Sequence, residues 1–266
     1  MEKYIIALDL DGTLMTSFND YDLETFEYVK KLKQDGHIIV LATGRPYRST
    51  KFIYDILGLD TPMLNYNGAI VINPSDVSFP KVDIRIHKES LCDILYNTKG
   101  VINAFCEIGD NIYVNSLTEK IKPFLHLDGG FLIEGQMCNT LDGNPNGALV
   151  FVEHEFANSF EYYVVKNYSG ELLVRHWQIE DCNIVEVYNP HTTKGNGLDY
   201  VAKYYNIPVE RVIAIGDGHN DIEMLDYAGI AVAMKNSNPS LLPYADYVTD
   251  SNQNQGVLKF LKSFFK

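Results

Sequence analysis

Residues 4–13 read YIIALDLDGT, an apolar run that ends in two carboxylates, a glycine and a threonine. An uninterrupted apolar run of this length is typical of a strand that is covered on both faces of a parallel sheet. Side chains alternate along an extended chain, so Asp9 and Asp11 lie on the same side, and Gly12 allows the backbone to turn its N–H groups toward an anion. Taken alone, the stretch is also compatible with an ordinary acidic junction between a strand and a turn.

Strand-like and helix-like patterns alternate in two separate parts of the chain. Apolar runs mark the strands, and apolar residues at helical spacing mark the helices between them. This alternation predicts an α/β fold, a Rossmann-like parallel sheet covered by helices on both faces, formed by residues 1–82 together with 189–266. The predicted strands span 4–10, 37–43, 63–72 (around an Asn-Gly turn), 212–216, 230–234 and 247–250, and the predicted helices span 21–34, 194–205, 220–228 and 256–265, with another after Pro46.

The intervening residues 83–188 have a different pattern, in which strands cluster around separate helices. This arrangement predicts an inserted α+β domain with an antiparallel sheet. We expect the aromatic side chains of this insert, among them Tyr162, Tyr163 and Trp177, to pack in its core rather than to contact a substrate. The predicted helices span 88–98 and 154–168, the strands span 101–108, 111–116, 148–152, 171–179 and 183–188, and an irregular Gly-, Asn- and Pro-rich stretch covers 128–147.

All four cysteines fall in the insert: Cys92, Cys106, Cys138 and Cys182. They show neither a C-x-x-C spacing nor a zinc-like pairing. The sequence leaves a disulfide open, but we expect free, buried thiols, because a chain of this length can bury a core without crosslinks.

The composition excludes several classes of protein. With 266 residues, 46% hydrophobic and 21% charged, the chain has the make-up of an ordinary globular protein. The formal charge of −13 repels polyphosphate backbones and anionic lipid, so we expect neither nucleic acid nor membrane as a partner. No apolar run approaches the roughly 18 residues of a membrane span, and the N-terminus lacks a signal-peptide pattern. We therefore expect a cytoplasmic protein. We also expect a monomer, because the insert can cover a ligand site within one chain.

Besides residues 9–13, two short segments could hold an anion. In Ala42-Thr43-Gly44-Arg45-Pro46, a hydroxyl and a glycine amide precede a predicted helix, and such a junction can bind a phosphate oxygen; the alternative is a plain helix cap. Lys194 begins a predicted helix, where a cation is disfavoured by the helix dipole. An anionic partner would account for its position, whereas the alternative is a solvated surface lysine.

The segment Gly216-Asp217-Gly218-His219-Asn220-Asp221 follows a predicted strand. Asp217 and Asp221, four residues apart with Asn220 between them, suit a hard, oxygen-binding cation such as Mg²⁺, although a solvated loop would also account for them. His219 is a candidate base or ligand, but loop histidines usually have neither role. All four segments lie at or near predicted carboxyl ends of strands, where open α/β sheets bind their ligands.

In order, spacing and placement, these segments together resemble the motifs of the haloacid dehalogenase (HAD) superfamily of phosphatases. The first motif, D-x-D-G-T, is matched by residues 9–13, and the Ser/Thr of the second motif by Thr43. The third-motif lysine is matched by Lys194, and the fourth motif, G-D-x-x-N-D, by residues 216–221.

Further features resemble the Cof-type subgroup, which carries a large C2-type cap. These are the T-G-R at 43–45, the N-G-A at 67–69, and the size and position of the insert. One departure is that Asn254 and Gln255 precede Gly-Val where the Cof-type pattern usually has an acidic pair.

The resemblance implies a phosphoric monoester hydrolase that depends on Mg²⁺ and acts on a small phosphorylated metabolite, with sugar phosphates expected first. It implies that Asp9 attacks phosphorus to form an aspartyl-phosphate, and that Asp11 protonates the leaving alcohol and then activates water. The insert, residues 83–188, would be the cap that sets substrate specificity.

The resemblance also implies the ligands of the site. Mg²⁺ would be held by the carboxylates of Asp9 and Asp217, by the backbone carbonyl of Asp11, and by Asp221 through water. Whether Arg45 or His219 contacts the substrate stays open. The expected phosphate-binding residues are Gly12, Thr43, Gly44, Lys194 and Asn220.

Three other functions share these residues. A phospho-accepting signalling module also uses Asp, Thr, Lys and Mg²⁺, and a non-catalytic protein could bind sugar phosphates on the same fold. The second carboxylate, Asp11, and the large insert argue against the first, and the intact Asp9, Asp11, Lys194 and Asp217 argue against the second. Phosphotransfer to another sugar, as in phosphomutases, also stays open.

Overall fold

The computed structural model describes residues 2–266, which divide into two compact units. Of the described residues, the first unit contains 2–45, Thr50–Val82 and Thr193–Lys266, and the second contains Pro46–Ser49 and Asp83–Thr192. The insert was expected to span 83–188, whereas the second unit extends to Thr192 and also includes Pro46 and the first three residues of the helix Tyr47–Ile56.

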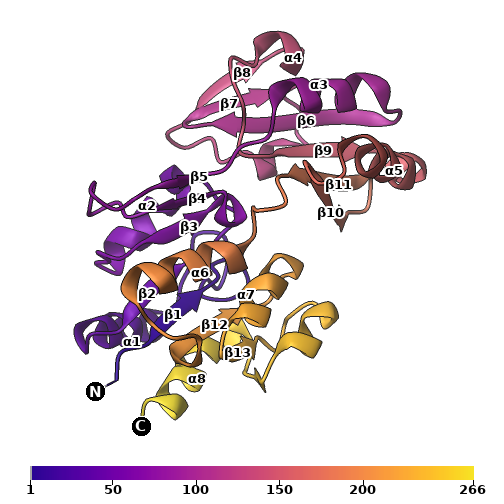
Figure 1. Ribbon diagram of the computed structural model, residues 1–266. Helices are drawn as coiled ribbons and strands as arrows, with labels where there is room; N and C mark the ends of the chain where they lie inside the picture. The colour runs from indigo at the N-terminus through magenta and orange to yellow at the C-terminus, as the bar shows by residue number, and fades with distance from the viewer. Residues whose placement is uncertain (1) are drawn as a thin grey trace. The chain divides into compact units, whose positions relative to one another are not determined.

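The first unit is built on a five-stranded parallel sheet with the order β14-β13-β12-β1-β2 (Figure 1). A small three-stranded sheet, β3-β4-β5, adjoins β2 through a bridge between Ala42 and Leu64. The predicted α/β fold is confirmed. The strands are β1 (Ile5–Leu8), β2 (Ile38–Leu41), β3 (Met63–Asn65), β4 (Ile70–Ile72), β5 (Val82–Asp83), β12 (Val212–Gly216), β13 (Ile230–Ala233) and β14 (Tyr247–Val248).

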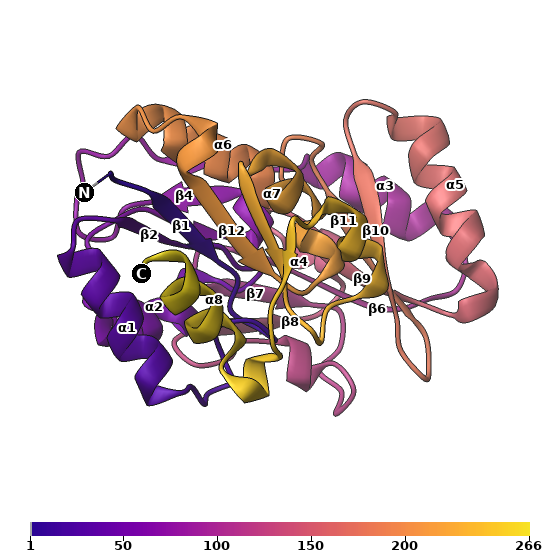
Figure 2. The ribbon, with the colours of Figure 1, turned by 90° about the horizontal axis from the view of Figure 1, so that it is seen from below.

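Helices cover both faces of the parallel sheet. Figure 2 shows α6 and α7 on one side of the strands, and α1 and α8, which contact each other, on the other side. Every residue of β1, β2 and β12 is buried, because alternate side chains enter opposite apolar layers. The helices are α1 (Leu23–Gln34), α2 (Tyr47–Ile56), α6 (Lys194–Tyr205), α7 (Ile222–Tyr227) and α8 (Gly256–Phe264).

The second unit is built on a six-stranded sheet with the order β10-β11-β9-β6-β7-β8. Its helices pack on one face, in a cluster with Leu91, Met137 and Phe160, and an irregular segment with Ile121 and Leu125 covers the other face. The helices are α3 (Lys88–Asn97), α4 (Met137–Thr140) and α5 (Ala157–Tyr168), and the strands are β6 (Val101–Ile108), β7 (Asn111–Val114), β8 (Phe131–Glu134), β9 (Ala148–Val152), β10 (Leu173–Gln178) and β11 (Asn183–Tyr188).

Two expectations for this unit were wrong. The sheet is mixed rather than antiparallel, because β7 and β8 pair in parallel. Both β8 and α4 lie within 128–147, which was expected to be irregular. Strand β8 lies at the edge of the sheet and keeps three of its four residues exposed, so it lacks the alternation that marks a half-buried strand.

Two further predictions on side chains needed correction. Cys92 and Cys138 form a disulfide, with their Cα atoms 5.5 Å apart, whereas Cys106 and Cys182 are free and buried as expected. The disulfide joins α3 to α4, and the second partner lies in a helix that the sequence did not predict. Tyr162 is 66% exposed on α5 instead of packing in the core.

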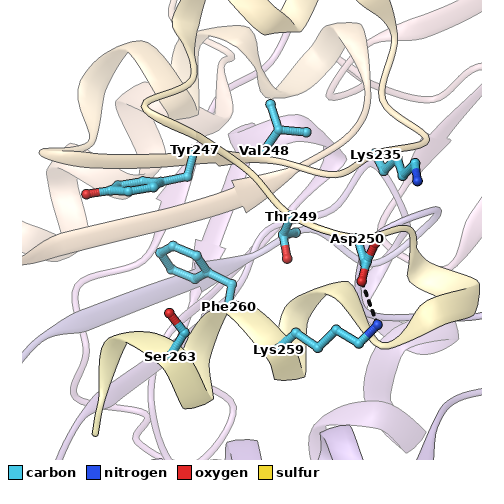
Figure 3. Close-up of a pocket in the computed structure, with 8 residues that line it drawn as sticks. All are labelled: Lys235, Tyr247, Val248, Thr249, Asp250, Lys259, Phe260 and Ser263. Atoms are coloured by element: carbon cyan, nitrogen blue, oxygen red, sulfur yellow. Dashed lines mark hydrogen bonds and ion pairs between the residues drawn. The ribbon is translucent and has the colours of Figure 1, made fainter.

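A shallow hollow of about 550 Å³ lies between β14 and α8 in the first unit (Figure 3). Tyr247, Phe260 and Lys259 line it, and Lys259 is paired with Asp250 at 2.5 Å. None of the motif residues lines this hollow, so it is not the candidate active site. Within residues 2–266, no helix combines the length and apolar character that crossing a membrane requires.

Candidate active site

Parallel pairing brings the carboxyl ends of three strands to one edge of the sheet. Leu8 at the end of β1 pairs with Leu41 of β2 and with Ile215 of β12. The first, second and fourth motif segments, which follow these strands, therefore leave the sheet at the same edge. This is the position in which open α/β sheets bind ligands.

The loop after β1 is held tightly. The N–H of Asp9 donates to the carbonyl of Ile215 at 3.0 Å, and the N–H of Met15 donates to the carbonyl of Leu10 at 2.9 Å. Gly12 has a φ of +78°, and a Cβ there would lie 2.3 Å from Oδ2 of Asp217. Glycine is needed at this position for both conformation and space.

Lys194 begins α6 and is completely buried. Its Nζ lies 2.5 Å from Oδ1 of Asp9 and 2.6 Å from Oδ1 of Asp221. Burial alone would lower the pKa of this lysine, but the charges of Asp221 and Asp9 outweigh burial and raise its pKa above the ordinary value. The cation at a helix start is thus explained by two carboxylates, and the alternative of a solvated surface lysine is excluded.

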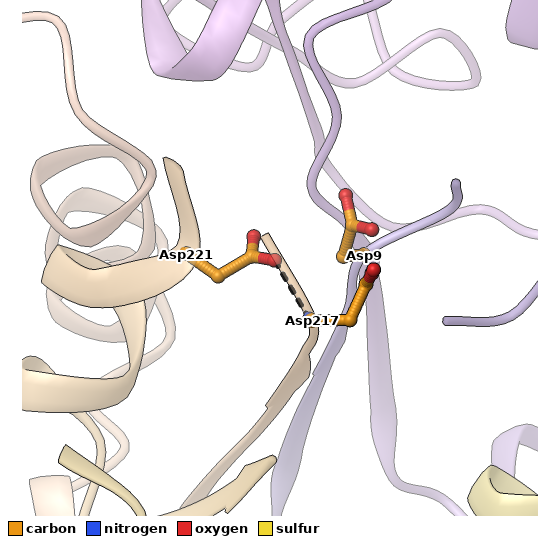
Figure 4. A group of neighbouring side chains, drawn as sticks. All are labelled: Asp9, Asp217 and Asp221. Carbon is orange, nitrogen blue, oxygen red and sulfur yellow. Dashed lines mark hydrogen bonds between the residues drawn. The ribbon is translucent and has the colours of Figure 1, made fainter. Parts of the chain in front are cut away.

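The fourth motif segment folds back on itself after β12. Oδ2 of Asp221 accepts the N–H groups of Asp217 and Gly218 at 3.0 and 2.9 Å. Oδ1 of Asp217 accepts the hydroxyl of Thr13 at 2.8 Å. These contacts fix both carboxylates, and Figure 4 shows them turned toward the carboxylate of Asp9.

Three carboxylates form a cluster, and the charge of one lysine does not balance theirs; they belong to Asp9, Asp217 and Asp221. One oxygen from each lies within 4.8 Å of the others. Burial and the charge of Asp221 raise the pKa of Asp9 well above its usual range, and burial raises the pKa of Asp217 to about 6. A group of oxygen donors with excess negative charge fits a hard divalent cation, which would relieve both effects.

The side chains beside this cluster come from the loops after β2 and β3 and from the short helix His219–Asp221. Thr43 is buried, and its carbonyl accepts the N–H of Asn67 at 3.0 Å. Oδ1 of Asn67 accepts the amide of Asn220 at 2.9 Å, and a Cβ on Gly44 would lie 3.2 Å from the same oxygen. Thr43, Gly44 and Asn220 are therefore brought together, with Asn67 between them.

Asp11 is not part of the carboxylate cluster. Its side chain is 52% exposed and is held by the guanidinium of Arg45, which is almost completely buried. Nε of Arg45 donates to Oδ2 of Asp11 at 2.8 Å, and Nη2 donates to Oδ1. His219 is exposed. The two carboxylates of the first motif thus have different surroundings.

Three residues of the site received no role from sequence. Thr13 and Asn67 lie inside the motifs quoted above, and this position could have indicated a role for their polar side chains. Asn67 also has a φ of +54°, in the left-handed region. Asn236 gave no signal, yet its amide donates to the carbonyl of Gly12 at 2.8 Å and lies 3.5 Å from Oδ2 of Asp217.

Comparison with known proteins shows the family of this chain. The haloacid dehalogenase-like hydrolase family matches residues 6–261. The chain is 32% identical over 267 residues to the 5-amino-6-(5-phospho-D-ribitylamino)uracil phosphatase YitU of Bacillus subtilis, a match that covers 99% of this chain and 98% of YitU.

Two solved structures from Bacteroides thetaiotaomicron share the fold along the whole chain. A haloacid dehalogenase-like hydrolase has a TM-score of 0.82 at 23% identity and covers 99% of this chain and 100% of its own. BT1666, one of the phosphatases of this superfamily, has a TM-score of 0.78 at 25% identity, covering 98% of this chain and 95% of its own. The chain therefore belongs to the haloacid dehalogenase-like hydrolases, as a Cof-type phosphatase.

Proposed function

We propose that this phosphatase hydrolyses small phosphate monoesters with Mg²⁺ through an aspartyl-phosphate on Asp9. The observation that carries the proposal is the buried cluster in which Lys194 contacts Asp9 and Asp221 while Asp217 lies beside them. Hydrolases of this superfamily generally use a divalent metal, and the cluster offers the oxygen donors that such a metal needs.

Asp9 is the proposed nucleophile. Lys194 holds Oδ1 of this carboxylate, which fixes its orientation at the edge of the sheet. A carboxylate oxygen of Asp9 forms a bond to phosphorus while the bond from phosphorus to the ester oxygen breaks. Water then attacks phosphorus, the bond to Asp9 breaks, and inorganic phosphate leaves with Asp9 restored.

Asp11 is the proposed acid and base. It gives a proton to the leaving alkoxide oxygen in the first step and takes a proton from the attacking water in the second. One positioned acid or base typically contributes about 10²–10⁴-fold, whereas phosphate-monoester hydrolysis requires enhancements of up to about 10²¹-fold. The reaction therefore needs the nucleophile, the phosphate ligands and the metal as well.

The carboxylates of Asp9 and Asp217 and the backbone carbonyl of Asp11 would hold the Mg²⁺, with Asp221 contributing through water. When bound, Mg²⁺ offsets the repulsion between a carboxylate nucleophile and a phosphate dianion. Asp217 is contacted by Thr13 of the first motif and by Asn236, which follows β13. We propose that these two residues orient the carboxylate of Asp217 as a metal ligand, because hydrogen bonds to a metal-binding side chain fix its geometry.

The phosphate oxygens would be bound beside the cluster. Preorganised donors aimed at the transferred phosphoryl group stabilise its charge in the transition state. Asn67 holds the amide of Asn220 through its oxygen, so that the orientation of this amide is fixed. The proposed ligands are the Thr43 hydroxyl, the Lys194 ammonium, the Asn220 amide and the backbone N–H groups near Gly12 and Gly44.

We propose a sugar phosphate or sugar-alcohol phosphate as the substrate. The support is the similarity to YitU, whose name gives a ribitol phosphate ester as its substrate, along nearly the whole length of both chains. The inserted unit would act as a cap that selects the leaving alcohol. The first compound to test is 5-amino-6-(5-phospho-D-ribitylamino)uracil, beside a panel of hexose and pentose phosphates.

The test measures phosphate release from this panel with Mg²⁺ and with EDTA. We expect turnover of at least one sugar or sugar-alcohol phosphate that Mg²⁺ restores after EDTA treatment. The absence of turnover over the whole panel with Mg²⁺ would contradict the proposed substrate class, and turnover that persists in EDTA would contradict the proposed metal.

A further inference from the structure

Arg45 is a buried arginine whose side chain faces the exposed carboxylate of the first motif. Its guanidinium contacts both oxygens of Asp11, through Nε at 2.8 Å and through Nη2. The side chain of Arg45 is only 3% exposed, while that of Asp11 is 52% exposed. The arginine is therefore the buried side of the contact, and the carboxylate is the side that faces solvent.

Arg45 is itself fixed by several other contacts. Nη2 also donates to the carbonyl of Phe18 at 2.9 Å, and the guanidinium lies 4.2 Å from the centre of the Phe18 ring. Its backbone N–H donates to the hydroxyl of Thr43 at 3.1 Å, and its carbonyl accepts the amide of Asn65 at 2.9 Å. Main chain and guanidinium are thus both anchored within the first unit.

An exposed aspartate without such a contact samples several side-chain rotamers. A planar guanidinium that meets both carboxylate oxygens restricts the plane as well as the position of the carboxylate. Proton transfer to a leaving oxygen requires hydrogen-bond distance and alignment, so this restriction affects the chemical step.

We propose that Arg45 is the positioning residue of Asp11. It holds the carboxylate in the orientation from which Asp11 gives its proton to the leaving oxygen, as the bond from that oxygen to phosphorus breaks, and later takes a proton from water. This role rests on the proposed function, in which Asp11 is the acid and base. In the alternative role, Arg45 binds the substrate directly. The experiment below distinguishes this role from the positioning of Asp11.

Two esters of similar shape distinguish these roles. In p-nitrophenyl phosphate the leaving group is a stable phenolate that needs no proton, whereas p-nitrobenzyl phosphate releases an alkoxide that does. With enzyme in excess over substrate and Mg²⁺ present, the rate at which p-nitrophenol or p-nitrobenzyl alcohol is released in a single turnover reports the phosphorylation step alone. The variants are Arg45→Gln and Arg45→Lys.

We expect Arg45→Gln to slow phosphorylation by p-nitrobenzyl phosphate by about 10²-fold and phosphorylation by p-nitrophenyl phosphate by less than about fivefold. Arg45→Lys keeps the charge but not the two-point contact, so we expect it to behave like the glutamine variant. It also tests the proposal if the glutamine variant does not fold. The matched control is Arg48→Gln, since the Arg48 side chain is only 7% exposed and holds Glu107 through two nitrogens, at 2.7 and 2.9 Å. We expect this control to leave the ratio of the two rates unchanged.

A double variant completes the test. In an Asp11→Asn background, Arg45→Gln is expected to cause no further loss with p-nitrophenyl phosphate, because a positioning residue acts only through the group that it holds. A further loss there, equal slowing with both esters, or full recovery in Arg45→Lys would overturn the positioning role. If the unchanged protein forms no phosphorylated species with either ester, the proposed function itself fails, and this inference with it.

Discussion

The two units bury ionised side chains in different ways. In the second unit, two buried arginines each contact a glutamate: Arg48 contacts Glu107 at 2.7 Å, and Arg175 contacts Glu186 at 3.1 Å. In the first unit, three aspartates gather around one lysine at the end of the parallel sheet. Balanced pairs are typical of structure, whereas an unbalanced group that raises the pKa of its own members is typical of a functional site.

The largest expected effect concerns Asp9 itself. Asp9→Asn should lower kcat by about 10⁴-fold or more while the protein stays folded, because an amide cannot serve as the nucleophile. Phosphate release with Mg²⁺ measures the loss, and circular dichroism checks the fold. Turnover within tenfold of the unchanged protein would show that another group attacks phosphorus.

The next prediction compares buried cations in the two units. Lys194→Met leaves Asp9 and Asp221 without their cation, and we expect a loss of about 3–5 kcal/mol in the free energy of unfolding together with loss of turnover. Arg175→Met, in the second unit, should also destabilise the chain but keep the turnover of p-nitrophenyl phosphate per folded molecule. Urea unfolding and activity assays measure both. If both variants lost turnover equally, the distinction between the units would fail.

The disulfide of the second unit should affect stability alone. Cys92 and Cys138 are 46 residues apart in sequence, and closing a loop of that length stabilises a chain by up to about 4 kcal/mol in the chain-entropy account. Cys92→Ser should therefore lower the free energy of unfolding without changing the turnover of p-nitrophenyl phosphate. Equal stability of both proteins under oxidising conditions would contradict this crosslink.

The smallest effect depends on pH and concerns Asp217. Burial raises its pKa to about 6 in the folded chain, above the value of about 3.9 in an unfolded one. The folded state therefore binds this proton more tightly than the unfolded state does. Below about pH 4 the carboxyl group is protonated in both states and does not change the free energy of unfolding, whereas above about pH 6 it lowers that free energy.

Without metal, Asp217→Asn should raise the melting temperature at pH 7.5, by an amount equivalent to about 1–3 kcal/mol, and the gain should vanish near pH 4. Thermal unfolding in EDTA at both pH values measures the difference. Bound Mg²⁺ should reverse the order at pH 7.5, since only the aspartate stabilises the ion. A difference that is the same at both pH values would contradict the raised pKa.

Prediction from sequence worked best where both faces of a sheet are covered. The strands around Ile5–Leu8 and Val212–Gly216 are continuous apolar runs, and their parallel order brings Asp9, Asp217 and Asp221 together, whereas Asp11 lies apart. It failed in the second unit at β8, an exposed edge strand whose pattern matches neither a buried nor a half-buried strand. Because α4 was missed as well, the proximity of Cys92 and Cys138 was not visible in the sequence.

The site divides in the same way. The candidate residues inside the motifs were named from the sequence, and their roles stay predictions. Lys194 contacts two carboxylates of the chain itself, which the sequence did not indicate. The contact of Arg45 with Asp11 depends on how the loop containing Phe18 folds over the guanidinium, and no periodic pattern encodes such a loop. Asn236 reaches Gly12 across 224 residues of sequence, a contact that only the tertiary structure creates. The monomeric state stays a prediction.

The most direct test of the central claim is to trap the phosphorylated enzyme. The protein is mixed with Mg²⁺ and p-nitrophenyl phosphate, quenched in acid within milliseconds, and digested for mass spectrometry, with fragmentation that separates Asp9 from Asp11. Our account predicts one added phosphoryl group on Asp9, absent in Asp9→Asn. A phosphoryl group on any other residue, or active turnover with none on Asp9, would contradict it.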